Sequence, residues 1–361
     1  MGDVIARRTY LYVGCYTHES SIGIHVYDSS DATGRLAKLS EVDGIEHPSF
    51  LATHPSGNVL YAVSETTSPE GGGLVALRVD PVDGSLTVID RVSSHGDAPC
   101  YVSVDADGRY LYVANYLSGT IAVYALALDG SFGELVAAHQ HSGSGPSARQ
   151  QGPHAHCIVP GPVDDSVYAV DLGTDRVNHY VHDRQHEGDA FVLDDQLVLD
   201  AGSGPRHLAF HPEQPVGFLV CELDSTIVTL GVDPTDGRLT RLRSSSTLPD
   251  DFVGESIAAE VRVHPNGRHV YVSNRGHDSI AVFGFTGPGE PLEPLGHVHS
   301  GGRTPRNFAV HPSGRALLVA NQDSDTVVPF EIDTGTGVPH QLDVTYHMSQ
   351  PVCITFLEVA R

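Results

Sequence analysis

The sequence repeats one pattern at a spacing of about 50 residues, and this constrains its fold more than any other feature. In residues 264–283, HPNGRHVYVSNRGHDSIAVF, a turn opens the unit, an alternating strand follows, polar residues interrupt it, and a second strand closes it. This is the pattern of a β-hairpin. Seven copies occur, with aligned positions at Tyr12, Tyr61, Tyr112, Tyr168, Phe218, Tyr271 and Leu317. Each period has room for four short strands, so we predict an all-β, seven-bladed β-propeller that occupies residues 1–361 as a single domain.

The two ends of the chain indicate how the ring closes. Six hairpins follow a further strand-like segment, whereas the hairpin that contains Tyr12 has none before it. The last residues, QPVCITFLEV (350–359), resemble this missing segment and have no hairpin after them. We therefore expect the C-terminal strand to complete the N-terminal blade, because closure hides both sheet edges; an open array of hairpins would expose them. No helix is expected, since apolar residues alternate instead of recurring every three or four positions.

Composition limits the partners and the location of the protein. The formal net charge is −24 and Lys38 is the only lysine, so the surface repels nucleic acid and anionic lipid, and neither is an expected partner. The five cysteines form no CxxC pair and lie in or beside predicted strands, which favours buried core positions over disulfides or metal ligands. Residues 1–8 are too short and polar for a signal peptide, and no apolar run is long enough to span a membrane. We expect a cytoplasmic protein, and the sequence indicates no oligomeric state.

The candidate site follows from propeller topology. The innermost strand of each blade begins on the face where the next strand ends, so residues at these positions meet around the central channel. They are mainly charged or imidazole residues in the last four repeats: His154, His156, Arg206, His207, Glu260, Arg262, Arg306 and Asn307 at strand starts, and Asp171, Glu222, Arg275 and Gln322 at strand ends. Four arginines are thus expected near one channel mouth, and clustered arginines require an anion or interleaved carboxylates.

These two kinds of compensation imply different roles for the carboxylates. The carboxylates could neutralise the arginines in a structural network, or the arginines could bind a substrate carboxylate or phosphate while one glutamate remains free as a base. Glu222 is the candidate base, because it follows the apolar strand 218–221 at its channel end. His154 and His156 are two residues apart and could share a metal with a third ligand, but no matching ligand set is evident and no metal or cofactor is expected. The polar connections 142–152 and 244–256 could cover the site or be plain linkers.

Several segments, taken in order, carry a family resemblance. They are YLYVGCYT (10–17), LYAVSE (60–65), YLYVANYLSGTIAVY (110–124), GPHAHC (152–157), DLGTDRV (171–177), GPRHLAFHP (204–212), CELDST (221–226), VSNRGHDSI (272–280) and TPRNFAVHP (304–312). Together they cover nearly the whole chain. The sequence resembles the seven-bladed propeller lactonases, which include propeller-type 6-phosphogluconolactonases and carboxy-cis,cis-muconate cyclases.

The resemblance implies a catalytic set of His154, Arg206, Glu222 and Arg275, all of which topology also selects. The leading hypothesis is metal-independent hydrolysis of a small anionic lactone such as 6-phosphogluconolactone, with Glu222 as general base, the two arginines stabilising the oxyanion and His154 protonating the leaving oxygen. The acid and base roles could be exchanged. Lactonisation of a carboxylated muconate is one alternative, and a non-catalytic propeller that binds a peptide or small anion is another.

Overall fold

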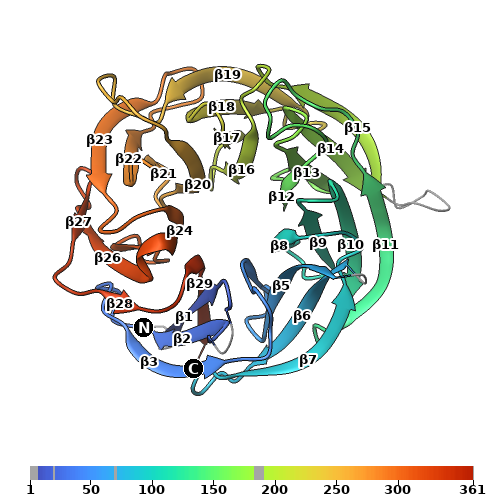
Figure 1. The fold of residues 1–361 in the computed structure, drawn as a ribbon, viewed down its shortest axis with the longest axis vertical. Coiled ribbons are helices and arrows are strands. Elements are labelled where there is room, and N and C mark those ends of the chain that lie inside the picture. The colour runs from blue at the N-terminus through green and yellow to red at the C-terminus, as the bar shows by residue number, and fades with distance from the viewer. Residues whose placement is uncertain (1–6, 19–20, 69–70, 183–190, 361) are drawn as a thin grey trace, which may run out of the picture.

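The structure, a computed structural model, confirms the seven-bladed β-propeller. It describes residues 7–18, 21–68, 71–182 and 191–360, and seven antiparallel sheets stand around a common axis in it (Figure 1). In six blades the strands follow chain order from the innermost strand outward. In the first blade the innermost strand is the C-terminal strand, and the N-terminal strands follow it outward. One short 3₁₀ turn, η1 (Gln322–Ser324), occurs within the described ranges, and no helix there is long and apolar enough to cross a membrane.

Within each blade the strands follow one another from the innermost outward. Blades 1 to 3 comprise β29 (Pro351–Ala360), β1 (Arg7–Cys15), β2 (Ile24–Asp28) and β3 (Ala37–Val42); β4 (Leu51–Thr53), β5 (Val59–Ser68), β6 (Gly71–Val79) and β7 (Leu86–Ser93); and β8 (Pro99–Val104), β9 (Tyr110–Asn115), β10 (Thr120–Leu126) and β11 (Phe132–Gln140). Blades 4 and 5 comprise β12 (Ala155–Pro160), β13 (Ser166–Asp171), β14 (Arg176–His182) and β15 (Phe191–Val198); and β16 (Pro205–Phe210), β17 (Val216–Cys221), β18 (Thr226–Val232) and β19 (Leu239–Ser246). Blades 6 and 7 comprise β20 (Ile257–Val263), β21 (His269–Arg275), β22 (Ser279–Gly284) and β23 (Glu293–His299); and β24 (Pro305–Val310), β25 (Ala316–Asn321), β26 (Thr326–Ile332) and β27 (Pro339–Gln341), with β28 (Tyr346–His347) also pairing with β26.

The C-terminal strand closes the ring. Strand β29 pairs antiparallel with β1 from Arg7 opposite Ala360 to Cys15 opposite Pro351. The first blade is therefore built from both ends of the chain, and the two termini lie beside it in Figure 1. This confirms the predicted closure, in which the innermost strand of the first blade pairs with β1.

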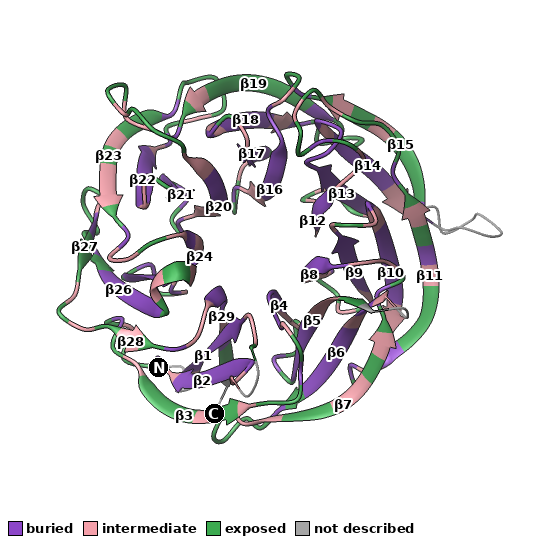
Figure 2. Cartoon of the chain, in the orientation of Figure 1, coloured by how far each residue is buried: buried purple, intermediate pink, exposed green. Residues whose placement is uncertain are grey.

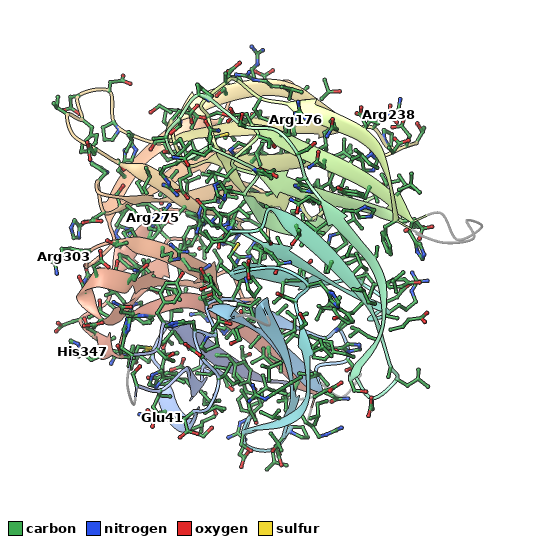
Figure 3. All side chains as sticks on the ribbon, turned by 45° about the vertical axis from the view of Figure 1, so that its right-hand side comes forward. Glu41, Arg176, Arg238, Arg275, Arg303 and His347 are labelled. Atoms are coloured by element: carbon green, nitrogen blue, oxygen red, sulfur yellow. The ribbon has the colours of Figure 1, made fainter. Side chains whose placement is uncertain are left out.

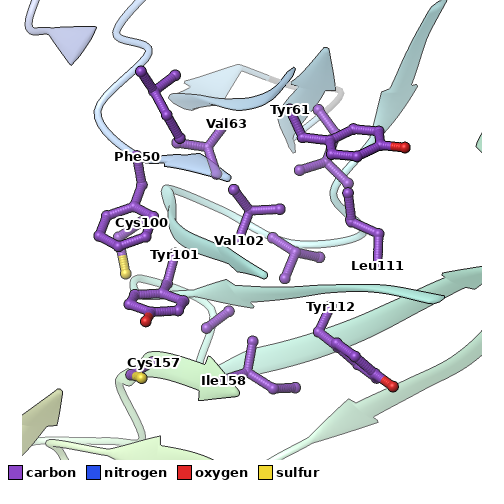
Figure 4. Packing of buried hydrophobic residues seen from close by; sticks show 14 of the residues in the cluster. Phe50, Tyr61, Val63, Cys100, Tyr101, Val102, Leu111, Tyr112, Cys157 and Ile158 are labelled. Atoms are coloured by element: carbon purple, nitrogen blue, oxygen red, sulfur yellow. The ribbon is translucent and has the colours of Figure 1, made fainter. Parts of the chain in front are cut away.

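The core lies between neighbouring blades. The first three strands of each blade are mainly buried and the outermost strands, such as β3 and β19, are mainly exposed (Figure 2). Figure 4 shows Val102 and Ile158 packed with the surrounding apolar residues of blades 2 to 4. All five cysteines are free and buried, as predicted.

The tyrosines that mark the repeat also join the blades. The buried hydroxyls of Tyr12, Tyr61 and Tyr271 donate hydrogen bonds to the carbonyls of Gly84, Gly130 and Gly337, at 3.0, 2.8 and 2.8 Å. Each glycine lies in an outer turn of the following blade. A buried tyrosine needs a partner for its hydroxyl. The repeated aromatic residue therefore packs the interface and also sets the position of the adjacent blade.

Candidate active site

One face of the ring gathers several of the predicted site residues. On this face, which we call the start face, the innermost strands begin and the next strands end. The same backbone hydrogen bond occurs there in six blades. In each, a residue at the end of the second strand donates its N–H to the carbonyl of a residue just before the innermost strand. The donors are Tyr16, Glu65, Tyr116, Leu172, Glu222 and Gln322. In the remaining blade, Arg275 pairs with Ile257. The predicted meeting of strand starts and strand ends is confirmed.

A β-bulge at the start of the innermost strand aims further side chains toward this face. The register shifts across Cys100, His156, Arg206 and Arg306, so that each of these residues lacks a partner in the ladder. A bulge re-aims the extra residue and is common next to active sites. Arg206 and Arg306 therefore occupy equivalent positions in blades 5 and 7.

Glu222 is the centre of an ion-pair cluster. Its Oε2 lies 2.9 Å from Nε of Arg206 and 2.8 Å from Nη2 of Arg275, and its Oε1 accepts a 2.5 Å hydrogen bond from Nη1 of Arg149. The Glu222 and Arg206 side chains are each only 2% exposed, whereas that of Arg149 is 45% exposed. In Figure 3 Arg275 lies closer to the middle of the molecule than Arg303, which lies at its edge. Both oxygens of Glu222 are thus occupied, which differs from the hypothesis of a free carboxylate.

The charges of this cluster determine its protonation. Burial alone would raise the pKa of Glu222, but Arg275, Arg206 and Arg149 hold it well below its usual range. Burial lowers the pKa of Arg275, with the charges of Arg206 and Arg306 adding to this effect and Glu222 opposing it. A guanidinium remains protonated at neutral pH even so. Glu222 is therefore an ionised carboxylate and a weak base.

Two arginine nitrogens of the cluster remain available to a ligand. Nη1 of Arg206 donates to the carbonyl of Ala259 at 2.7 Å, and Nη2 of Arg275 donates to that of Ala258 at 3.1 Å. Nη2 of Arg206 and Nη1 of Arg275 have no hydrogen-bond partner in the described ranges. These groups are fixed by Glu222 and by the backbone, and they can donate to an oxyanion without reorganising.

His154 lies beside the cluster on the side of blade 3. Its Nδ1 is 2.8 Å from the carbonyl oxygen of Tyr116, and its ring stacks on the ring of Tyr116 with centroids 4.5 Å apart. A carbonyl can only accept, so Nδ1 carries the proton and the neutral ring has a lone pair on Nε2. The Tyr116 hydroxyl is in turn 3.2 Å from Nη2 of Arg149. Tyr116 thus connects His154 to the Glu222 cluster.

Arg306 has a different environment from the other arginines of the start face. Its guanidinium carbon lies 5.5 Å from the centroid of the Tyr16 ring, and it makes no ion pair or hydrogen bond with any other described residue. The Tyr16 hydroxyl donates to Oε2 of Glu65 at 3.0 Å, and Oγ of Ser49 also donates to Oε2. Burial would lower the pKa of Arg306, but Tyr16, Glu65 and Glu222 raise it.

Three predicted site residues lie one residue deeper in the channel. His207 is 3.2 Å from Glu260, whose other oxygen accepts a 2.5 Å hydrogen bond from Asn307. The His207 ring also contacts Phe50 and Tyr101, with centroids 5.8 and 5.1 Å away. Blade 5 is adjacent to neither blade 2 nor blade 3, so these rings meet across the centre. His207 and Asn307 directly follow a bulge, and Glu260 lies within one. The side chains of these three residues therefore lie below the start face.

Arg262 differs most from the expectation. It forms a 3.4 Å ion pair with Glu260 and lines a cavity of about 380 Å³ together with the far ends of the innermost strands, such as Thr53 and Val104. Phe50 and Tyr101 line the same cavity. Arg262 is two residues further along β20 than Glu260, so it lies toward the opposite end of the channel.

Three other predicted residues are placed as follows. Asp171 is fully buried, where Oδ1 accepts the backbone N–H of His154 at 2.9 Å and Oδ2 is 2.6 Å from His141. It therefore positions His154 through the backbone. His156 is buried beside Tyr116 and His207, and burial together with Arg206 lowers its pKa well below the ordinary value. Gln322 lies in η1, and its side chain makes no hydrogen bond with another described residue.

Sequence reasoning placed Tyr116 at a strand end of this face without giving it a role, and it did not select Arg149. Arg149 lies in the polar connection 142–152, for which the sequence left open whether it covers the site or is a plain linker. Tyr116 occupies the strand-end position of blade 3, equivalent to Glu222 in blade 5, and this equivalence was the available signal. Among the residues that the structure describes, no three His, Cys, Asp or Glu side chains are grouped so as to hold a metal ion.

The fold and this site define a seven-bladed propeller with an arginine-rich cluster around one buried carboxylate. Residues 10–356 match the family model described as "Lactonase, 7-bladed beta-propeller". The chain is 33% identical over 353 residues to the 6-phosphogluconolactonase of Bacillus subtilis, covering 96% of this chain and 97% of that protein.

Solved structures agree with this assignment. The periplasmic gluconolactonase PpgL of Pseudomonas aeruginosa superposes with a TM-score of 0.87 at 31% identity, covering 97% and 99% of the two chains. A Bacteroides fragilis protein that is named provisionally as a 6-phosphogluconolactonase gives a TM-score of 0.89 at 27% identity, with 99% of both chains covered. The chain belongs to the seven-bladed propeller lactonase family, and these relatives support a lactone-hydrolysing enzyme.

Proposed function

We propose that this protein hydrolyses the lactone of an anionic sugar acid, with 6-phosphogluconolactone as the leading substrate. One observation carries the proposal. Arg149, Arg206, Arg275 and Arg306 gather on the start face, where the first three share the single carboxylate of Glu222 and Arg306 stacks on Tyr16, although the chain as a whole has a net charge of −24. A cationic site on an acidic protein favours an anionic ligand over a neutral one of the same shape.

The reaction requires a base, an acid and a stabilised oxyanion. Water adds to the lactone carbonyl carbon, and its proton passes to the base. The carbonyl oxygen becomes an oxyanion, the ring carbon–oxygen bond then breaks, and the ring oxygen takes up a proton to become a hydroxyl. The product is a hydroxy acid, which releases one proton to the solution at neutral pH.

The geometry favours His154 for both the base and the acid role. Glu222 is ionised and held by three arginines, so it is a poor base and cannot act as an acid. His154 has its lone pair on Nε2 and a fixed ring orientation. We therefore assign His154 as the group that takes the proton from water and returns it to the ring oxygen. Arg206 and Arg275 stabilise the oxyanion, and Glu222 holds both in place.

A pH-stat assay on freshly prepared 6-phosphogluconolactone, glucono-δ-lactone and a carboxymuconolactone tests the proposal. We expect turnover of the phosphorylated lactone above the spontaneous rate, unchanged by EDTA. His154→Gln should lower kcat by about 10²–10⁴-fold. Turnover of the muconolactone alone would instead support the cyclase alternative, and turnover of no lactone would contradict the proposal.

The cellular location remains a prediction. A relative of the same family is a periplasmic gluconolactonase, so we treat cytoplasmic location as a separate proposal. Fractionation of the source cells followed by immunodetection would test it, and recovery in the periplasmic fraction would contradict it.

A further inference from the structure

The start face has two chemically different halves. Blades 4 to 6 carry His154, Arg206, Glu222 and Arg275, whose polar side-chain groups are tied to one another or to the backbone. The half formed by blades 7, 1 and 2 carries Arg306, Tyr16, Ser49 and Glu65, which we call the Glu65 group. These residues contact one another but leave several polar atoms without partners among the described residues.

The unpartnered atoms of the Glu65 group include both a hydrogen-bond acceptor and hydrogen-bond donors. Oε2 of Glu65 accepts from Tyr16 and Ser49, whereas Oε1 makes no hydrogen bond with another described residue. The guanidinium of Arg306 stacks on Tyr16 and likewise makes none within the described ranges. Both residues are only partly exposed. An acceptor and several donors are therefore held side by side by the same tyrosine.

This combination suits hydroxyl groups better than a second anion. A hydroxyl both donates and accepts, so a vicinal diol can donate to Oε1 of Glu65 and accept from Arg306. An anion at this position would meet the carboxylate of Glu65, while the three arginines around Glu222 offer a more favourable site. We infer that the Glu65 group binds the hydroxylated end of the substrate and makes the enzyme selective for polyhydroxylated lactones over lactones without hydroxyls. This inference rests on the proposed lactonase function, which it deepens by assigning the residues that recognise the substrate.

The orientation of the substrate follows from this division. The lactone carbonyl lies toward Arg206 and Arg275, and the carbons that carry hydroxyls extend toward blades 7, 1 and 2. A site built to bind a hydroxyl rejects an analogue that lacks it, because the polar groups of the protein are then left without partners. A muconolactone, which has no polyol chain, would leave Glu65 and Arg306 unpaired.

The test compares two lactones of equal ring size. We expect wild-type kcat/KM to be higher for glucono-δ-lactone than for δ-valerolactone, and Glu65→Gln to reduce this ratio by about 10–100-fold, the loss expected for a hydrogen bond to a charged group. The glutamine carbonyl can still accept from Tyr16 and Ser49, which preserves the local structure. Arg306→Gln should also reduce the ratio, and Arg306→Lys should restore part of it. Glu134→Gln on the exposed face of β11 is the matched charge control.

A binding measurement decides the inference even without turnover. Isothermal titration with gluconate and with hexanoate, an acid of the same length without hydroxyls, should give at least about tenfold tighter binding of gluconate, lost in Glu65→Gln. If no lactone is hydrolysed but this difference is found, the proposed function fails and the polyol site remains. Equal losses for both lactones in Glu65→Gln, or equal binding of the two acids by the wild type, would overturn the inference.

Discussion

Replacing Glu222 by glutamine should destabilise the fold, because it removes the negative charge that Arg206 and Arg275 share at 2.9 and 2.8 Å. Removing one partner of a buried ion pair typically costs about 3–5 kcal/mol, since the remaining charge is left uncompensated. The Arg149 pair adds little, because that side chain is 45% exposed. Unfolding 361 residues at about 2.1 cal/mol/K per residue gives an entropy of about 0.76 kcal/mol/K, so Tm should fall by about 4–7 °C.

Differential scanning calorimetry of the wild type and Glu222→Gln, with and without inorganic phosphate, tests this reasoning. Phosphate at ten times its Kd should restore about 1.4 kcal/mol to the variant, because the uncompensated arginines bind an anion. The wild type should gain less. Glu134→Gln, on the exposed part of β11, should shift Tm by less than about 1 °C. A shift of less than about 1 °C in Glu222→Gln, or an equal phosphate effect in both proteins, would refute the argument.

The other expectations concern pH, the Arg149 contact, the His154 tautomer and ring closure. Because the folded pKa of Glu222 lies below its unfolded value, its stabilisation is complete above about pH 4.3 and is lost as the pH falls toward the folded value, so the Tm difference between wild type and Glu222→Gln should shrink below about pH 4. Arg149→Gln should raise the pKa of Glu222 and shift acid unfolding, followed by circular dichroism, to higher pH; an unchanged midpoint would argue against the contact. His154→Gln should keep its Tm within about 1 °C while losing activity, and a large loss of stability would point to a structural role. Deletion of residues 350–361 removes the partner of β1, and we expect an unfolded or aggregated chain; a monomeric, cooperatively folding product would contradict closure by β29.

The fold was predictable because short-range sequence patterns specify each repeat. Alternating apolar residues and turn residues specify each hairpin without reference to distant parts of the chain. The aligned tyrosine was visible in the sequence, but its hydrogen bond to a glycine of the next blade was not, because Tyr12 and Gly84 are 72 residues apart.

The sequence predicted which residues lie at the strand ends on one face of the ring, but no more of the site than that. His154, Arg206, Glu222 and Arg275 were selected in this way, and the structure places all four on the start face. Depth along the strand was not predictable. A bulge adds one residue near the start of an innermost strand such as β16, so Arg206 reaches the start face while His207, the next residue, lies among the aromatic rings below it.

The sequence by itself determined the number of blades, the closure by the C-terminal strand and the residue types that meet on the start face, because each depends on local patterns and on their order. Only the tertiary structure decided which charges pair. Arg149 reaches Glu222 from a connection 73 residues away, Arg306 is left with Tyr16 instead of a carboxylate, and Arg262 faces the other end of the channel. The physical reason is that an ion pair depends on distances of a few ångströms between blades, which no local pattern encodes.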